Sequence, residues 1–508
     1  MFPTQSRGRS SASPEVQTTN LFEGSSEGLR HRLQSQGQTL NPAVPDLHPN
    51  PDTIELPPRP PSAGELPAPL DFLTPSKFKG TFYVDTNRIE KFPAKQIEQD
   101  ALSTRVILHQ RMPALLDTFL KYKRIYGSSY ERRLYADMNW LSLATRMIEK
   151  RPLCFLQSND FTRLRNGKYI GAAYAEWDRV GTEAQHLNKH LTLAEYLSYD
   201  EIMLSSLLGA SAPTHFINSG SRNNCGRPAR GGVAHQARGV MVGLAGPRFD
   251  RDAQHDSAVI CAPPARGDAV VGGRMDPGVR RLVQQWLLPG VDLDARPDPY
   301  ALDDAFDVAM YKARLRVSFD VLLLEAEARA RATGKDAIVH VVGLGLGVWR
   351  KYKAQNTWFI EAFAESLDAL NLQYIATVEF GWISGVPDKT KQAVEAAAAK
   401  NVIDVKFTQA DPCRKREKGK LLVVSWAWDG NSYVGNEYWN GSLNSSSDPA
   451  AVCYSTIGEL MNPDINPFAD RVIVLGLGNE QESLPWEEPE DEGEENVGNK
   501  DGGACGLD

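Results

Sequence analysis

The fold class is decided by the stretch Ile338-Val339-His340-Val341-Val342-Gly343-Leu344-Gly345-Leu346-Gly347-Val348-Trp349. Its first five residues have the composition of a buried strand, and a glycine-rich loop follows directly. On both sides of it, apolar runs alternate with helical patterns. The expected helices are 305–332, 358–370, 389–400 and 450–460, and the expected strands are 338–342, 374–378, 402–407, 421–426 and 472–475. This alternation predicts an α/β fold with a mainly parallel sheet flanked by helices on both faces.

Both ends of the chain differ from this region in composition. Residues 1–75 are rich in Pro and Ser and contain a polyproline-like run at 56–61. Such a segment buries too little apolar surface to offset its ordering entropy, so we expect a disordered tail. After residue 478 the chain becomes acidic, and residues 479–508 are expected to form a second disordered tail.

The middle of the chain divides into an extension and one domain. Residues 76–150 have apolar side chains at helical spacing and predict an N-terminal helical extension. Residues 151–478 are expected to form one α/β domain, in which 251–300 lack a clear period and predict an irregular insertion. Further strand-like runs lie at 152–156, 214–218 and 239–244.

Composition restricts the class of partner and the compartment. The 508-residue chain has a formal net charge of -8, which is a poor prior for a nucleic-acid or anionic-membrane binder. Six cysteines without a C-x-x-C pair favour a reducing compartment over disulfides or zinc. The N-terminus has no secretory pattern, and no apolar run approaches the roughly 18 residues of a membrane span. We expect a cytoplasmic protein, with the nucleus not excluded.

The loop that follows strand 338–342 is a candidate phosphate site. Gly343, Gly345 and Gly347 would let the backbone approach a bound group, and free N–H groups at the next helix start suit an anion. The spacing differs from the G-x-G-x-x-G of dinucleotide folds, and there is no Walker lysine. A tight turn with close packing is the alternative interpretation.

The loop after strand 421–426 has the chemistry of a ligand site. Between Trp428 and Gly441 it combines four aromatic residues with amides, glycines and the two carboxylates Asp429 and Glu437. Aromatics can stack on a base or sugar, amides can bind hydroxyls, and carboxylates can orient water. The alternative is a packed turn in which Asp429 bonds only to its own backbone.

Other candidates are less specific. Asp448 precedes Pro449, a pattern typical of a helix N-cap, and such a cap also suits an anionic ligand. Asn218 and Arg222 flank a glycine-rich loop that follows a strand, so they contact a ligand or build a turn. No H-E-x-x-H motif or G-x-S-x-G elbow occurs, and we expect neither a metal nor a cofactor.

Together these motifs resemble those of the MavL-type ADP-ribosyl hydrolases, a macrodomain-related family with bacterial and eukaryotic members. The resemblance covers about residues 150–477 and is firmest in 336–467. It implies that residues 151–478 form a macrodomain-like catalytic domain. In macrodomains the catalytic loop precedes the phosphate loop; the reversed order here implies a permuted or rebuilt sheet.

The resemblance also implies roles for individual residues. Three acidic residues serve ADP-ribose hydrolysis in the family, and the matching positions are Asp429, Glu437 and Asp448. The family has Asp at the middle position, so Glu437 is a departure that puts its role in question. The implied substrate-binding residues are Gly343, Gly345, Gly347, Asn431, Gly435, Asn436, Tyr438, Asn218 and Arg222.

The implied reaction is release of ADP-ribose from a modified protein. ADP-ribose would lie across the strand ends, with its pyrophosphate on the glycine loop and its distal ribose held by Asn431 and Asn436. One of the three acids would orient water against C1″, as in glycoside hydrolysis. The implied partner is ADP-ribose or an ADP-ribosylated protein, with no nucleic acid or membrane. Alternatives are a non-catalytic ADP-ribose reader, a nucleotide-dependent transferase and a scaffold acting through the two tails.

Overall fold

The computed structural model describes most of the chain between residues 87 and 476. The described ranges are 87–156, 159–171, 174–221, 224, 226–229, 234–261, 275–293, 306–416, 418–443 and 456–476. All of them belong to one compact unit, Leu47–Asp508. The two tails expected to be disordered lie outside the described residues, as do Arg222 and Asp448.

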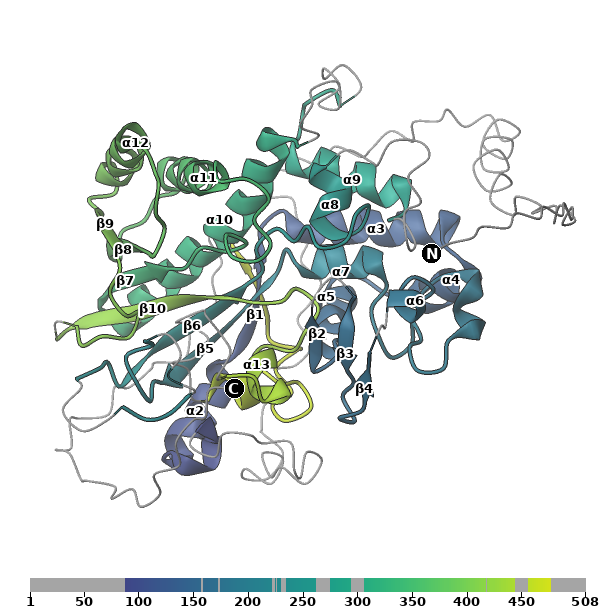
Figure 1. Ribbon diagram of the computed structural model, residues 1–508, viewed down its shortest axis with the longest axis horizontal. Helices are drawn as coiled ribbons and strands as arrows, with labels where there is room; N and C mark the ends of the chain where they lie inside the picture. Colours follow the sequence, from purple (N-terminus) through teal and green to yellow (C-terminus); the bar gives the residue numbers. More distant parts are fainter. Residues whose placement is uncertain are drawn as a thin grey trace, which may run out of the picture. The chain divides into compact units, whose positions relative to one another are not determined.

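An eight-stranded sheet forms the centre of this unit (Figure 1). Its order is β11 (Val472–Leu475), β1 (Arg105–His109), β5 (Gly209–His215), β6 (Arg238–Leu244), β10 (Lys420–Ala427), β7 (Asp336–Val341), β8 (Ile375–Gly381) and β9 (Asp404–Thr408). Within the sheet β5 alone runs antiparallel to the other strands. The predicted α/β class with a mainly parallel sheet is confirmed.

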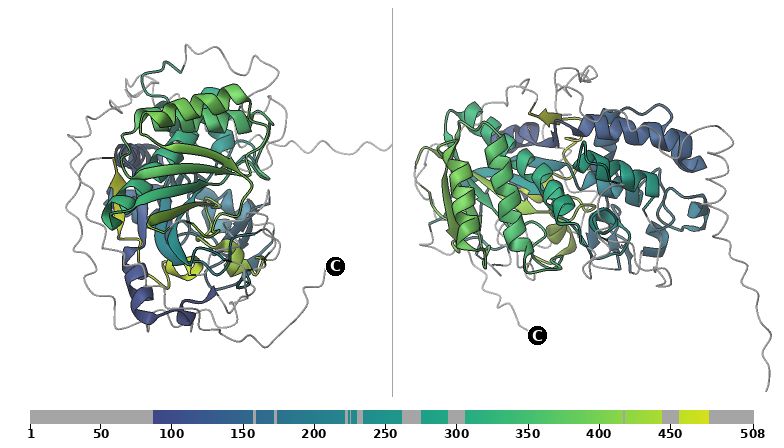
Figure 2. Two further views of the ribbon diagram at one scale, coloured as in Figure 1. Left: turned by 90° about the vertical axis from the view of Figure 1, so that its left-hand side faces the viewer. Right: turned by 90° about the horizontal axis from the view of Figure 1, so that it is seen from above.

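Helices cover both faces of the sheet. In Figures 1 and 2, α11 (Gln355–Ala369) and α12 (Asp388–Ala399) lie on one face, and α2 (Ala94–Ser103) and α13 (Asn436–Asn440) lie on the other. The long helix α10 (Val308–Thr333), predicted as 305–332, contacts strands from β11 to β8. It begins where Asp307 accepts a hydrogen bond from the N–H of Met310 and ends at Gly334, whose φ of 63° only glycine adopts easily.

The N-terminal segment is part of the sheet and is not a separate helical extension. It contains the expected helices, namely α2, α3 (Met112–Tyr126), α4 (Ser129–Tyr135) and α5 (Trp140–Glu149), after the short turn η5 (Ile89–Lys91). Between α2 and α3, however, β1 pairs with β5 and β11. Arg105 begins this strand with a buried ion pair to Glu325 of α10, 2.6 Å long. A charged residue is therefore compatible with a fully buried strand.

The expected irregular insertion also contains helices. Its described residues include α8 (His255–Ile260) and α9 (Pro277–Leu287), so this prediction was wrong for those segments. The predicted strand near residue 154 is confirmed, but in a separate three-stranded sheet. That sheet consists of β2 (Cys154–Leu156), β3 (Phe161–Arg163) and β4 (Tyr169–Ile170).

The remaining helices are short. They are α6 (Tyr174–Trp177), η6 (Glu183–Leu187), α7 (Tyr199–Ser205) and α15 (Ile457–Leu460). Of the expected helix 450–460, only residues 456–460 are described. No helix in the described ranges combines the length and apolar character needed to span a bilayer.

Candidate functional site

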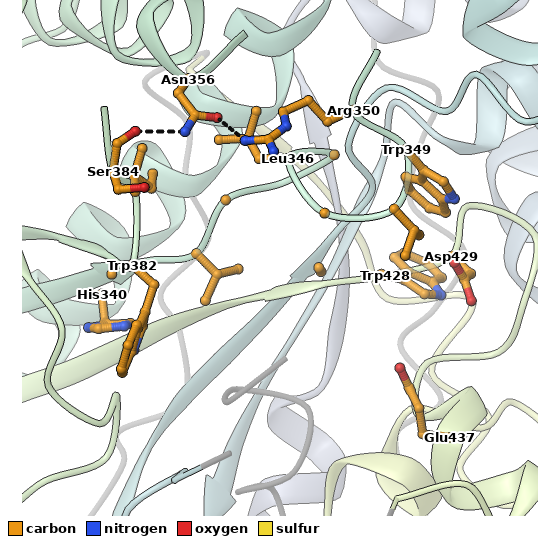
Figure 3. A pocket seen from close by; sticks show the side chains of 18 residues that line it. His340, Leu346, Trp349, Arg350, Asn356, Trp382, Ser384, Trp428, Asp429 and Glu437 are labelled. Carbon is orange, nitrogen blue, oxygen red and sulfur yellow. Dashed lines mark hydrogen bonds between the residues drawn. The ribbon is translucent and has the colours of Figure 1, made fainter. Parts of the chain in front are cut away.

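A cavity of about 350 Å³ lies at the carboxyl ends of β7, β8 and β10. In open parallel sheets this is the edge at which ligands bind. Figure 3 shows labelled side chains grouped at two ends of the cavity. Trp349, Trp428, Asp429 and Glu437 line one end. His340, Asn356, Trp382 and Ser384 line the other.

The glycine loop, residues 343–347, forms part of the cavity wall. Gly343, Gly345 and Gly347 all line the cavity. Gly345 has a φ of 72°, a conformation that disfavours any residue with a Cβ. The N–H groups of Gly347 and Val348 donate to no other residue in the described ranges. They are therefore available to an anion.

A second loop, which follows β6, packs directly on the glycine loop. A Cβ built on Gly246 would lie 2.2 Å from the backbone nitrogen of Gly345 and 2.4 Å from the carbonyl carbon of Leu344. Only glycine allows this approach of two backbones. The position of the glycine loop therefore depends on residue 246.

A tight turn after β10 positions the first carboxylate. The N–H of Ser432 bonds to the carbonyl oxygen of Asp429 at 2.9 Å, and the indole of Trp428 bonds to the carbonyl of Ser432 at 2.9 Å. Gly435, with a φ of 82°, then reverses the chain into α13. The side-chain amide of Asn436 donates to Oδ2 of Asp429 at 2.6 Å. This bond holds the carboxylate in one orientation.

The second carboxylate comes from α13. Glu437 is the second residue of this helix, and its carboxylate points toward the end of the cavity where Asp429 lies (Figure 3). Both residues line the cavity and are half-buried. Two carboxylates facing one space can orient water and stabilise a developing positive charge.

The surroundings of Asp429 tune its protonation. Burial raises the pKa of Asp429 to about 6, and the charge of Asp250 adds to the rise. The positive charge of Arg248 and the hydrogen bond from Asn436 act in the opposite direction. The pKa of Asp429 is therefore close to neutral pH, where a carboxylate can accept a proton during a reaction and release it afterwards.

Comparison with known proteins identifies the family. A family model described as ADP-ribosylhydrolase MavL-like matches residues 72–268 and 295–472. The chain belongs to this family. It is an enzyme, an ADP-ribosyl hydrolase, and its family supports removal of ADP-ribose as its activity.

Two fruit-fly relatives agree with this assignment. The hydrolase is 33% identical to the Drosophila melanogaster ADP-ribosylarginine hydrolase CG3568 over 416 residues, which cover 76% of this chain and 80% of that protein. It is 32% identical to the Drosophila melanogaster ADP-ribosylarginine hydrolase CG2909 over 399 residues, covering 73% and 78% respectively.

The structure brings some of the predicted site residues of the hydrolase together. The three loop glycines, Asp429 and Glu437 all line the cavity. Asn436 does not line it but donates a hydrogen bond to Asp429, which does. Asn431 is fully buried, and neither polar atom of its amide meets a hydrogen-bond partner in the described ranges. Tyr438 is buried in the core, with its ring centroid 5.0 Å from that of Trp439. It is not among the residues that line the cavity.

Asn218 lies elsewhere. Because β5 is antiparallel to β6, His215 at the end of β5 pairs with Arg238 at the start of β6. The loop that follows β5 is therefore at the sheet edge opposite the cavity. There the side chain of Asn218 bonds to the carbonyl of Arg227 at 2.8 Å and to the N–H of Gly220 at 2.8 Å. These bonds build a turn, which was the alternative interpretation for this residue.

Sequence reasoning missed the contribution of the loop after β6. Nε of Arg248 donates to Asp250 at 3.1 Å, and its guanidinium lies 4.6 Å from the ring centroid of Phe155 and 5.8 Å from that of Trp349. Its backbone N–H bonds to Asp256 at 2.9 Å. The sequence shows only an arginine shortly after the apolar run 239–244, and this does not reveal that Arg248 is buried next to the site.

Among the described residues, no group of three or more His, Cys, Asp or Glu side chains has an arrangement that could hold a metal ion.

Proposed function

We propose that the protein removes ADP-ribose from arginine side chains by hydrolysing the bond at C1″ of the distal ribose. The observation that carries this proposal is the placement of Asp429 and Glu437 at one end of a cavity walled by the glycine loop. The names of the two fruit-fly relatives support arginine as the modified residue.

The proposed orientation of the substrate follows from the two chemistries of the cavity. The pyrophosphate of ADP-ribose lies against the glycine loop, where the N–H groups of Gly347 and Val348 are available. The distal ribose then reaches Asp429 and Glu437, and the arginine leaves through the same end. Trp349 and Trp428 supply apolar walls around the sugar.

In the proposed mechanism Asp429 is the general base. Its carboxylate accepts a proton from water as the water oxygen attacks C1″ and the C1″–nitrogen bond breaks. The electron pair of that bond goes to the guanidine, and the products are ADP-ribose and arginine. Glu437 stabilises positive charge on the ribose, a role that glutamate and aspartate can both fill. Asp448 remains a candidate for a third acidic role. Asn436 is a positioning residue, because it acts through Asp429.

We also propose a rebuilt macrodomain-like arrangement and a reducing compartment, cytoplasmic or nuclear. The phosphate and acid loops follow β7 and β10, which are neighbours in the sheet, and this supports a common ligand edge. Cys154 and Cys261 carry free thiols, which supports a reducing compartment.

The pH dependence of turnover tests the role of Asp429. Because its pKa is about 6, kcat/KM is expected to rise with pH and to level off above a midpoint near 6. Asn436→Ala removes a hydrogen bond that lowers this pKa, so the midpoint is expected to move to higher pH. The raised pKa also means that the contribution of Asp429 to the free energy of unfolding decreases as pH rises from about 4 to 6. If the midpoint of the pH profile of kcat/KM is the same in Asn436→Ala as in the unmodified protein, Asp429 is not the group that titrates.

Linkage preference tests the substrate. Histone or peptide substrates modified on arginine should lose ADP-ribose at least about tenfold faster than serine-modified ones at equal concentration. Mass spectrometry of the released ADP-ribose and of the restored side chain measures both rates. Faster release from serine would replace the arginine proposal while leaving the hydrolase activity intact.

A further inference from the structure

The end of the cavity away from the two carboxylates has no role in bond cleavage. His340, Gly381 and Trp382 line it, together with Asn356 and Ser384 (Figure 3). The amide of Asn356 bonds to the carbonyl of Ser384 at 2.7 Å and to Arg350 at 3.3 Å, which ties the loops around this end together. The end is therefore built from fixed groups.

Trp382 presents an indole at the rim of this end. It directly follows β8, and its side chain is 42% exposed. Its φ is 61°, a backbone conformation that is unusual for a large residue, and its N–H is held by the carbonyl of Thr408 at 2.9 Å. Strained residues held in place by their surroundings cluster at ligand sites. An exposed indole at a cavity rim suits stacking on a planar ring.

His340 presents a hydrogen-bond acceptor at the same end. Its ring is buried, and Nδ1 lies 3.4 Å from Oε2 of Glu379. Arg414 and Arg416 donate to the same carboxylate at 2.8 and 2.7 Å. Burial would raise the pKa of Glu379, but hydrogen bonds from His340 and Arg416 and the charges of both arginines lower it to about 2. An ionised Glu379 requires the proton of His340 on Nδ1.

The other ring nitrogen of His340 is then an acceptor beside the cavity. Burial lowers the pKa of His340. The hydrogen bond and charge of Glu379 act in the opposite direction, and the charges of Arg416 and Arg414 lower the pKa further, so the net shift is downward and favours the neutral ring. A Cβ built on Gly381 would lie 2.4 Å from Nε2. The bare backbone of Gly381 thus keeps open the space next to the lone pair of Nε2.

We propose that this end is a nucleobase subsite that selects adenine over 6-oxo purines, with the base stacked on Trp382 and its amino group donating to Nε2 of His340. Hypoxanthine carries a carbonyl oxygen at the same position, which would face the lone pair of Nε2. The inference rests on the proposed function for the direction in which ADP-ribose lies in the cavity.

Calorimetric titration of the full chain with two ligands tests the selection. One ligand is ADP-ribose, and the other is its hypoxanthine counterpart, inosine diphosphate ribose. The hypoxanthine ligand is expected to bind about tenfold or more weakly, because it leaves a buried acceptor unpaired. Equal affinities would overturn the selection of adenine and leave the proposed function standing. If neither ligand binds and no ADP-ribose is released, both proposals fail.

Variants separate the two contacts. His340→Leu should bring the ratio of the two affinities close to one, and Gly381→Ala should weaken ADP-ribose by filling the space beside Nε2. Trp382→Leu should weaken both ligands about tenfold and keep their ratio, since stacking does not depend on the base.

Tyr169→Leu is the control. It replaces another exposed aromatic, on β4, and should change neither affinity. Because Trp382 lies at the surface, its variant should fold even if His340→Leu does not. Unchanged affinity in folded Trp382→Leu would overturn the subsite.

Discussion

Asp429→Asn is expected to slow the release of ADP-ribose from an arginine-modified protein by about 10²–10⁴-fold. The substitution keeps the size of the side chain but removes the carboxylate that accepts the proton of water. The affinity for free ADP-ribose should stay within a few-fold, because the glycine loop and the nucleobase end are unchanged. Single-turnover release measures the first quantity, and calorimetry measures the second.

A matched control separates this effect from a general loss of charge. Asp388→Asn changes an exposed aspartate at the start of α12, and it should retain the full rate. Near-normal release by Asp429→Asn would refute its role as general base. Glu437→Gln, measured in parallel, shows whether that role belongs to the second carboxylate.

Gly246→Ala is expected to abolish measurable ADP-ribose binding, with a loss of about 100-fold or more. The added Cβ would meet backbone atoms of Leu344 and Gly345 at 2.2–2.4 Å, and backbone cannot move aside as a side chain can. The two loops must separate, which displaces the phosphate-binding N–H groups. Overpacking of this kind also costs about 1–3 kcal/mol of stability.

Calorimetry and thermal unfolding measure the two effects of Gly246→Ala. Gly171→Ala is the control, because a Cβ there meets nothing within 4 Å and its φ is ordinary. It should leave both binding and the unfolding temperature unchanged. Normal ADP-ribose affinity in Gly246→Ala would show that the glycine loop does not hold the pyrophosphate.

Local sequence was enough to predict most elements from α10 onward, but not the short helix α13, which lies in the segment expected to be a loop, nor all of the elements before α10. The strand 105–109 was missed because its burial depends on β5 and β11, which are far away in the chain, and because Arg105 reads as a surface residue until Glu325 is placed beside it. For α9 the sequence does carry the signals that predict a helix. Asp276 precedes Pro277 as an N-cap, and apolar residues recur at helical spacing: Val279, Leu282, Val283 and Trp286.

The site was predictable where strand direction follows from the fold class. Loops after β7 and β10 had to share an edge, because strands of a parallel sheet end on the same side. The order of strands cannot be read from one sequence, so the loop of Gly246 and Arg248 could not be placed beside them. The position of Asn218 away from the cavity could not be foreseen for a related reason. A strand followed by a glycine-rich loop gives no indication that the strand runs antiparallel.

The pairing of β1 with β11 has a consequence for synthesis of the protein. Val106 pairs with Val472. The ribosome must therefore translate 366 further residues after Val106 before the strand that covers this edge of β1 is complete to that position. At roughly 5–20 residues per second, this edge waits about 20–70 s on the ribosome. During that time an apolar strand edge is available to other chains. Expression at high rates should therefore depend on chaperones that shield nascent strands, more than for a domain whose neighbouring strands are adjacent in sequence.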